Sequence, residues 1–309
     1  MNIFDYLNTP APDIFYKRND PNDVRLGETV QTDPESYAEA NVVILGCPQD
    51  EGVRRNKGRI GAAQAPDEIR RTLYKFVPPD NDTLRLFDAG NTIIQDTLEE
   101  THAIHSQIVE QIIKDGKKIV SLGGGNDVSY PDCSGLAKAV DSVLAINVDA
   151  HFDVRADEIR NSGTPYRQLL EEGFIKGENF YEVGSMPMVN SPVYRDYLLE
   201  KNAHIIGLET IQSQGVHQVF AKILENDSET IFLGLDMDVV NVSYAPGVSA
   251  VNPLGLTAYE FCQIAAIVGA DKRTRIFEIT EFNPTYDIDS HTARLATAAI
   301  HTFLSHISM

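Results

Sequence analysis

Three residues with metal-binding side chains follow a short apolar segment near the middle of the chain. Asp149, His151 and Asp153 occupy alternate positions directly after residues 143–148. Alternate residues of an extended chain project to the same side, so we expect these side chains to share one side of a strand end. Carboxylate and imidazole together suit a divalent cation such as Mn²⁺. On this pattern alone, a solvated acidic loop explains the three residues equally well.

Small or acidic residues also follow three other apolar runs. These residues are Gly123 to Asp127 with Asn126 among them, then Asp236 and Asp238, and then Glu281. The carboxyl ends of parallel strands meet at one edge of a sheet, where open α/β sheets bind ligands. So many carboxylates repel one another unless cations lie among them. The strand ends therefore indicate a two-metal cluster, with ions roughly 3.5–4 Å apart that activate a shared water.

The apolar pattern predicts the elements that position these residues. Strands are expected at 41–46, 84–87 and 118–122 and near Val143, Phe180, His204, Thr230 and Thr274. Helices are expected at 65–76 and 97–114 and near Pro165, Pro192, Gly215, Thr257 and Ser290. About eight alternations of strand and helix predict a mainly parallel sheet that is covered on both faces. An eight-stranded barrel has the same alternation and stays open at this point.

The pattern also suggests how the chain is divided. Residues 1–40 are rich in Asp, Asn and Pro and show little periodicity, so we expect an irregular N-terminal arm over the domain or a neighbouring subunit. Residues 41–309 contain no linker, repeat or low-complexity tract. We therefore expect them to form a single α/β domain.

The composition restricts the classes of partner. Lys and Arg total 26 against 45 Asp and Glu in 309 residues, a formal charge of −19, which argues against nucleic acid and anionic membranes. Three cysteines without a CxxC pair indicate neither a disulfide framework nor a zinc knuckle. The N-terminal residues lack the basic start and the apolar core typical of a signal peptide, and no later apolar run approaches the ~20 residues of a membrane span. We expect a cytoplasmic protein whose partners are small molecules, cations or copies of itself.

Four motifs together resemble those of the arginases, agmatinases and formimidoylglutamases, the ureohydrolase family. They are GGGND (123–127), DAHFD (149–153), LDMD (235–238) and EFNP (281–284), in the family's order. The resemblance implies a three-layer α/β/α sandwich on an eight-stranded, mainly parallel sheet, and assembly into trimers or hexamers. It implies two Mn²⁺ ions held by Asn126, Asp149, His151, Asp153, Asp236 and Asp238. It also implies that Glu281 pairs with the substrate's amidine or guanidine and is catalytic together with Asp149 and His151.

Within this family the longer loops resemble those of formimidoylglutamases. They are CPQDEGVRRNKGRIGA (47–62), DAHFDVR (149–155), SGTPYRQ (162–168) and APGVSA (245–250). Agmatinases and arginases carry a His, thought to shuttle a proton, at the loop position of Ser162, which makes arginase chemistry the weaker alternative. The implied reaction is Mn²⁺-dependent hydrolysis of formimidoylglutamate to glutamate and formamide, a step of histidine catabolism. Hydrolysis of agmatine, arginine or another guanidine is the alternative.

Formimidoylglutamate has two carboxylates, and arginine side chains offer fork-shaped donors for such groups. The candidate substrate-binding residues are Arg54, Arg55, Asn56, Arg59, Ser162, Gly163 and Arg167. Surface charge and subunit contacts are the alternative explanation for the arginines.

Asn126 departs from the family motif, which has a His ligand for the more exposed metal at this position. An amide oxygen is neutral and a weaker donor to Mn²⁺ than imidazole. Three outcomes are open: an active enzyme with a weakened outer metal site, a one-metal enzyme, or a metal-poor protein without catalysis. The remaining acids and His151 favour an active enzyme. His102 and His105 share one face of a helix, and we expect them on its surface because no acidic strand end joins them.

Overall fold

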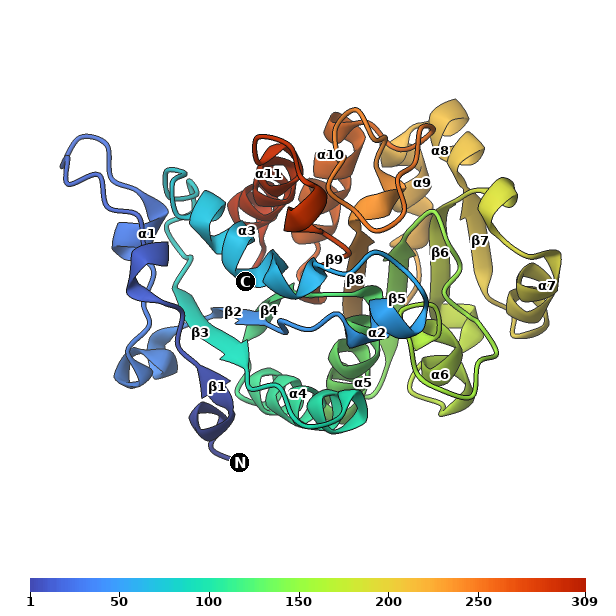
Figure 1. Cartoon of the computed structure of the whole chain (residues 1–309), viewed down its shortest axis with the longest axis horizontal. Coiled ribbons are helices and arrows are strands. Elements are labelled where there is room, and N and C mark those ends of the chain that lie inside the picture. The colour runs from blue at the N-terminus through green and yellow to red at the C-terminus, as the bar shows by residue number, and fades with distance from the viewer.

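A computed structural model describes all 309 residues, and its core is a nine-stranded sheet between two layers of helices (Figure 1). The strand order is β1-β3-β2-β4-β9-β8-β5-β6-β7, and only the pairing of β1 with β3 is antiparallel. The sheet is open, with β1 and β7 at its edges, which excludes the barrel. The predicted sandwich with eight parallel strands is confirmed, and β1 is a two-residue addition at one edge.

The strands are β1 (Leu7–Asn8), β2 (Val42–Gly46), β3 (Leu86–Thr92), β4 (Lys118–Leu122), β5 (Val143–Val148), β6 (Phe180–Ser185), β7 (His204–Gly207), β8 (Thr230–Asp236) and β9 (Thr274–Thr280). The α-helices are α1 (Leu26–Thr29), α2 (Glu51–Arg55), α3 (Ala65–Leu73), α4 (Leu98–Lys114), α5 (Ser129–Ala139), α6 (Pro165–Glu171), α7 (Pro192–Glu200), α8 (Leu208–Gln214), α9 (Val216–Ile223), α10 (Ala258–Gly269) and α11 (His291–His306). None of them combines the length and apolar character that crossing a membrane requires.

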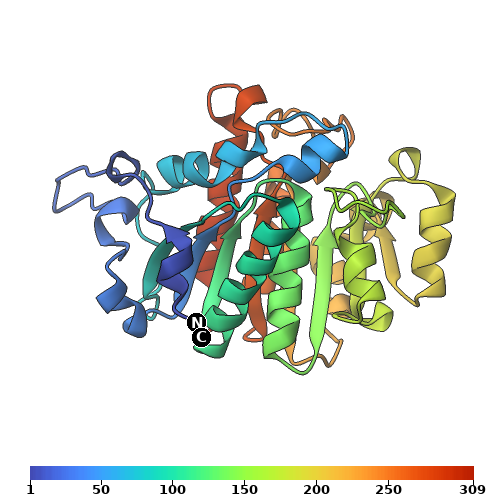
Figure 2. The ribbon, with the colours of Figure 1, turned by 60° about the horizontal axis from the view of Figure 1, so that its bottom comes forward.

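The strands are apolar on both faces because successive side chains alternate between two hydrophobic clusters. In β2, Val42 and Ile44 belong to the cluster covered by α3 and α8 to α11, whereas Val43 and Leu45 belong to the cluster covered by α4 to α7. Figure 1 shows α3, α10 and α11 on one side of the sheet, and Figure 2 shows α4 and α5 in front of the other. Helices therefore cover both faces of the sheet.

Local chemistry explains where several helices begin. Thr97 and Thr257 cap α4 and α10, each in a reciprocal capping box with a Glu three residues later. Pro165 and Pro192 stand in the first turns of α6 and α7, where a missing N–H costs nothing. The predicted starts of these four helices agree with the structure to within one residue.

Residues 1–40 contain short 3₁₀ turns together with β1 and α1. Leu7 and Asn8 pair with β3 at the edge of the sheet, and the side chains of Ile3, Ile14 and Leu26 are buried in the two clusters. This segment is therefore anchored along one edge of the sheet by apolar contacts.

Candidate metal centre and substrate cavity

Four neighbouring strands at the centre of the sheet, β4, β9, β8 and β5, carry all of the candidate metal-binding motifs. They end at the same level, since Leu122 pairs with Ile279, Asp236 with Thr280, and Val148 with Leu235. The chain runs from β4 to β5, and the later strands β8 and β9 lie between these two in the sheet. The motifs consequently meet at the carboxyl edge of the sheet, where such a change in strand order leaves a crevice.

The acidic side chains and His151 form two groups that share Asp149. Nδ1 of His151 lies 3.1 Å from Oδ2 of Asp238 and 3.4 Å from Oδ1 of Asp149. Asp149, Asp153 and Asp236 make up the second group, and in each group the ligand atoms lie within 4.8 Å of one another. Backbone N–H groups fix two of the acids: His151 donates to Asp149 at 2.7 Å, and Asp238 donates to Asp236 at 2.8 Å. The arrangement matches two adjacent cation sites with a common carboxylate.

Because these carboxyl groups are buried close together, ionising all of them costs free energy unless a cation lies among them. Burial, with the nearby Asp238, raises the pKa of Asp149 to about 6, and burial likewise raises the pKa values of Asp153 and Asp236 well above the ordinary range. The Asp238 carboxylate raises the pKa of His151, and Oδ1 of Asp238 is buried without a hydrogen-bond donor. Divalent cations would satisfy this orphaned oxygen and neutralise the acids, so the donor set fits Mn²⁺.

Two of the site residues have backbone conformations that are unusual for non-glycine residues. Asp153 has a φ of 47° and Glu281 a φ of 60°, both in the left-handed region. The N–H of Glu281 donates to the carbonyl of Gly124 at 2.9 Å, and the carbonyl of Asp153 accepts from Tyr166 at 3.2 Å. Such strain persists only where the surroundings impose it, and it concentrates at functional sites.

Asn126 lies within the second group of acids. Its Nδ2 is 2.5 Å from Oδ2 of Asp153 and 3.3 Å from Oδ2 of Asp149. Its Oδ1 accepts from the hydroxyls of Ser129 at 2.9 Å and Thr280 at 3.0 Å. Since hydroxyls also accept hydrogen bonds, a half-turn of the amide would direct Oδ1 toward the acids and leave Nδ2 with two acceptors. Asn126 therefore fits a metal site as an oxygen donor.

A cavity of about 350 Å³ opens above the acids. Glu281 is buried in its wall, and burial raises the pKa of this carboxyl to about 7. Its Oε1 accepts from the N–H of Asn126 at 2.9 Å, whereas Oε2 has no donor. Asn56 and Ser162, both predicted to bind substrate, also line the cavity and hydrogen-bond to each other at 3.0 Å.

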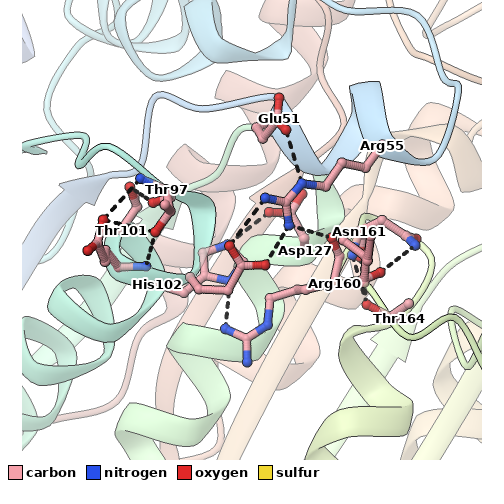
Figure 3. A network of polar contacts seen from close by, with 12 residues as sticks. Glu51, Arg55, Thr97, Thr101, His102, Asp127, Arg160, Asn161 and Thr164 are labelled. Atoms are coloured by element: carbon pink, nitrogen blue, oxygen red, sulfur yellow. Dashed lines mark hydrogen bonds and ion pairs between the residues drawn. The ribbon is translucent and has the colours of Figure 1, made fainter.

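The four candidate arginines lie outside the cavity wall. Arg54 forms a forked ion pair with Glu51, and Arg167 bonds to the carbonyl of Val154 and to Glu171. Arg59 donates to the carbonyls of Val248 and Ser249. Arg55 joins Glu51 to Glu99 and donates to the carbonyl of Arg160 at 3.0 Å (Figure 3). Each guanidinium thus has partners within the chain.

Arg155 lines the cavity although it was not among the predicted residues. It is the only Lys or Arg in the wall, and its guanidinium makes no ion pair within the chain. Its side chain crosses Gly163 so closely that a Cβ at Gly163 would lie 2.5 Å from Cδ of Arg155. Arg155 continues the alternate spacing of Asp149, His151 and Asp153, and that spacing is the sequence signal that identifies it.

The expectation that His102 and His105 lie on a helix surface was wrong. Both side chains are fully buried, because this face of α4 packs against α5 and the turn at Asp127. Nε2 of His102 lies 2.9 Å from Asp127, and Nδ1 lies 3.2 Å from Arg160, as Figure 3 shows. His105 lies 2.8 Å from Asp132. Neither histidine reaches the acids of the metal centre.

Comparison with known proteins identifies the family. The model of the arginase family matches residues 40–305. The chain belongs to the arginase family. Among family members, the formimidoylglutamase of Rhodococcus jostii is 33% identical over 279 residues, which cover 85% of each chain.

Solved structures of family members agree with the fold. The crystal structure of formiminoglutamase from Trypanosoma cruzi with Mn²⁺ has a TM-score of 0.85 at 30% identity, covering 91% of this chain and 97% of that one. For formimidoylglutamase from Bacillus subtilis the TM-score is 0.86 at 26% identity, with coverages of 94% and 93%. The predicted resemblance to the arginase family, with formimidoylglutamases as similar members, is confirmed.

Proposed function

We propose that this protein is a Mn²⁺-dependent hydrolase that cleaves the formimino C–N bond of formimidoylglutamate, giving glutamate and formamide. The observation that carries the proposal is one cavity in which a metal-binding acid cluster, an unpaired buried carboxylate and a free arginine face the same space. The similarity to formimidoylglutamases over most of both chains supports the same substrate.

Two ions are proposed, one in each group of acids. Asp149, His151, Asp236 and Asp238 would hold the inner ion, and Asn126, Asp149, Asp153 and Asp236 the outer ion. Bound Mn²⁺ supplies Lewis-acid polarisation and lowers the pKa of water to near neutrality. The neutral amide of Asn126 makes the outer site the weaker of the two.

Glu281 is proposed to hold the amidinium of the substrate. Its free Oε2 can accept an N–H from the cationic formimino group, while the N–H of Asn126 keeps Oε1 in place. A hydrogen bond between two charged groups is short and strong, particularly where water is excluded. Glu281 would thereby fix the planar carbon above the acid cluster in an orientation suitable for attack.

Arg155 is proposed to bind a substrate carboxylate. It lies at the cavity wall and forms no ion pair, unlike Arg54, Arg55 and Arg167. The hydroxyl of Ser162 and the amide of Asn56 provide neutral polar groups beside it. Arginine and agmatine differ from formimidoylglutamate at this end of the molecule, since arginine has one carboxylate and agmatine has none.

We also propose that the protein works in the cytoplasm as a homo-oligomer, a trimer or a hexamer. The reduced cysteines, two of them buried, agree with that compartment.

A substrate panel combined with metal analysis tests the proposal. The purified protein, loaded with Mn²⁺, is assayed with formimidoylglutamate, arginine, agmatine, guanidinobutyrate and guanidine. We expect formamide and glutamate from the first compound and little or no urea from the others, with about two Mn²⁺ per chain at saturation. Urea release from arginine without action on formimidoylglutamate would contradict the substrate assignment.

A further inference from the structure

The hydroxyl of Ser129 lies between a candidate metal ligand and a buried acid that no step above uses. Its Oγ is 2.9 Å from Oδ1 of Asn126 and 2.7 Å from Oε2 of Glu278. All three residues are buried, and Ser129 is the first residue of α5, whereas Glu278 belongs to β9. A hydroxyl has one proton to donate, so it cannot serve both oxygens with full strength.

The other side of Glu278 determines which oxygen receives that proton. Glu278 lies beside Asp132, and burial followed by the charge of Asp132 raises the pKa of Glu278 well above its ordinary value. Oε1 of Glu278 and Oδ2 of Asp132 are buried and have no other donor. The other carboxylate oxygen of Asp132, Oδ1, lies 2.8 Å from Nε2 of His105. A protonated Glu278 can donate from Oε1 to Oδ2 of Asp132, which leaves Oε2 of Glu278 as an acceptor.

With Oε2 of Glu278 as the acceptor, the Ser129 hydroxyl donates to Glu278, its shorter contact, in place of Asn126. Its lone pairs are then available to Asn126 and to Tyr166, whose hydroxyl is buried beside Glu278 and otherwise lacks a partner. If the Ser129 oxygen acts as the acceptor, the only Asn126 side-chain atom that can donate to it is Nδ2. This arrangement favours an amide that is turned relative to the structure, with its nitrogen toward Ser129 and Thr280 and its oxygen toward Asp149 and Asp153.

An amide oxygen between two carboxylates is repelled unless a cation lies among them, whereas an amide nitrogen there is attracted to the acids. The orientation of Asn126 is consequently coupled to the outer cation. In the structure Nδ2 faces Asp149 and Asp153, and a half-turn about Cβ–Cγ exchanges the two orientations with little change in shape.

We propose that Ser129 and Glu278 are positioning residues that hold the amide oxygen of Asn126 on the outer Mn²⁺. They make a neutral amide an effective ligand because they favour the orientation that presents oxygen. This inference rests on the metal part of the proposed function and is independent of which amidine is hydrolysed.

The test measures Mn²⁺ binding by calorimetry, with electron paramagnetic resonance to distinguish the two ions, in the absence of substrate. Ser129→Ala removes the acceptor for Nδ2, and we expect the second Mn²⁺ to bind roughly 10- to 100-fold more weakly while the first is unaffected. Ser134→Ala is the matched control, since Ser134 is a buried serine of the same helix that bonds to Ser106. We expect it to leave both affinities unchanged.

Two further variants separate orientation from packing. Glu278→Gln retains the hydrogen bonds around Ser129, because the amide nitrogen of Gln can donate to Asp132 and its oxygen can accept from Ser129. We therefore expect this variant to bind the second Mn²⁺ about as tightly as the unsubstituted protein. In an Asn126→Asp background both ends of the side chain are oxygens, and Ser129→Ala should then cost much less.

Equal effects of Ser129→Ala and Ser134→Ala would overturn the inference, as would equal weakening of both ions. So would a Ser129→Ala loss that is undiminished in the Asn126→Asp background. A single Mn²⁺ in the unsubstituted protein would overturn both the inference and the outer metal site while leaving the substrate assignment intact.

Discussion

Replacing Arg155 by Gln removes the only free cation of the cavity wall and keeps a polar side chain long enough to cross Gly163. If Arg155 binds a carboxylate of formimidoylglutamate, the variant loses one charge-assisted interaction. Glu281 and the acid cluster are unaltered, because Arg155 makes no ion pair with any of them. The loss should therefore appear in substrate recognition and not in metal content.

The size of the effect follows from the environment of the guanidinium. Hydrogen bonds to charged groups contribute a net ~1.5–3 kcal/mol, equivalent to roughly 10- to 150-fold in kcat/KM. Arg155 is exposed, and solvent screens its charge, so we expect the lower part of this range.

The assay compares kcat/KM for formimidoylglutamate and for formamidine, an amidine that lacks both carboxylates. Arg155→Gln should lower the first value and leave the second nearly unchanged. Arg54→Gln is the control, because Arg54 is an arginine of similar exposure that is bound to Glu51 outside the cavity. Gly163→Ala should repeat the Arg155→Gln result more weakly, since its Cβ displaces the Arg155 side chain. Equal losses on both substrates, or a control as impaired as Arg155→Gln, would refute the assignment.

Three further predictions concern the metal centre. Asp149→Ala and Asp236→Ala should abolish Mn²⁺ binding and activity together, and full metal retention in either variant, measured by elemental analysis, would contradict the ligand assignment. Asn126→His adds a stronger neutral donor, so a metal titration should show tighter binding of the second ion, and an unchanged isotherm would place residue 126 away from the metal. The pKa values of Asp149 and Glu281 are raised to about 6 and about 7, so the metal-free fold binds more protons than the unfolded chain, and its stability should fall as the pH rises from about 4 to about 7. Mn²⁺ binds the deprotonated acids, so the increase in Tm on adding Mn²⁺ should be larger at pH 8 than at pH 5.5, and an equal increase at both values would count against these acids as ligands.

The strand ends were predictable from sequence because they depend on local pattern. A strand buried on both faces is a short apolar run, and the first polar residue marks where it leaves the sheet. Thus the start of β5 at Val143 and the position of Asp149 follow from one stretch of sequence. The same reasoning located Asp236 and Glu281, and the parallel sheet brought them together.

Helix α5 was missed because its sequence contains Pro131 and Gly135, which normally interrupt helices. Pro131 stands in the first turn, where it is tolerated. At Gly135 a Cβ would lie 2.6 Å from the carbonyl of Ser106, so glycine is what allows α5 to approach α4 so closely. The burial of His102 and His105 results from that same close packing. No local pattern contains this information, since it depends on two helices meeting.

The arginines show a second limit of sequence reasoning. The sequence indicates that an arginine can form an ion pair with a carboxylate, but it does not show which carboxylate lies nearest. Glu51 forms ion pairs with Arg54 and Arg55, whereas Arg155 forms no ion pair within the chain. The free arginine is therefore identified by the absence of an ion-pair partner in three dimensions.

The charge balance of the site explains how the chain accommodates Asn126. When ionised, Asp149, Asp153, Asp236 and Asp238 would supply four negative charges, which the two proposed divalent cations would neutralise. Glu281 would then retain one charge for the cationic amidine. Imidazole and amide are both neutral ligands, so this balance is the same with His or Asn at position 126. In the proposed two-metal centre, Asn126 would therefore change the strength and orientation of one donor and would leave the electrostatic basis for two cations in place, which favours the active two-metal enzyme among the three outcomes.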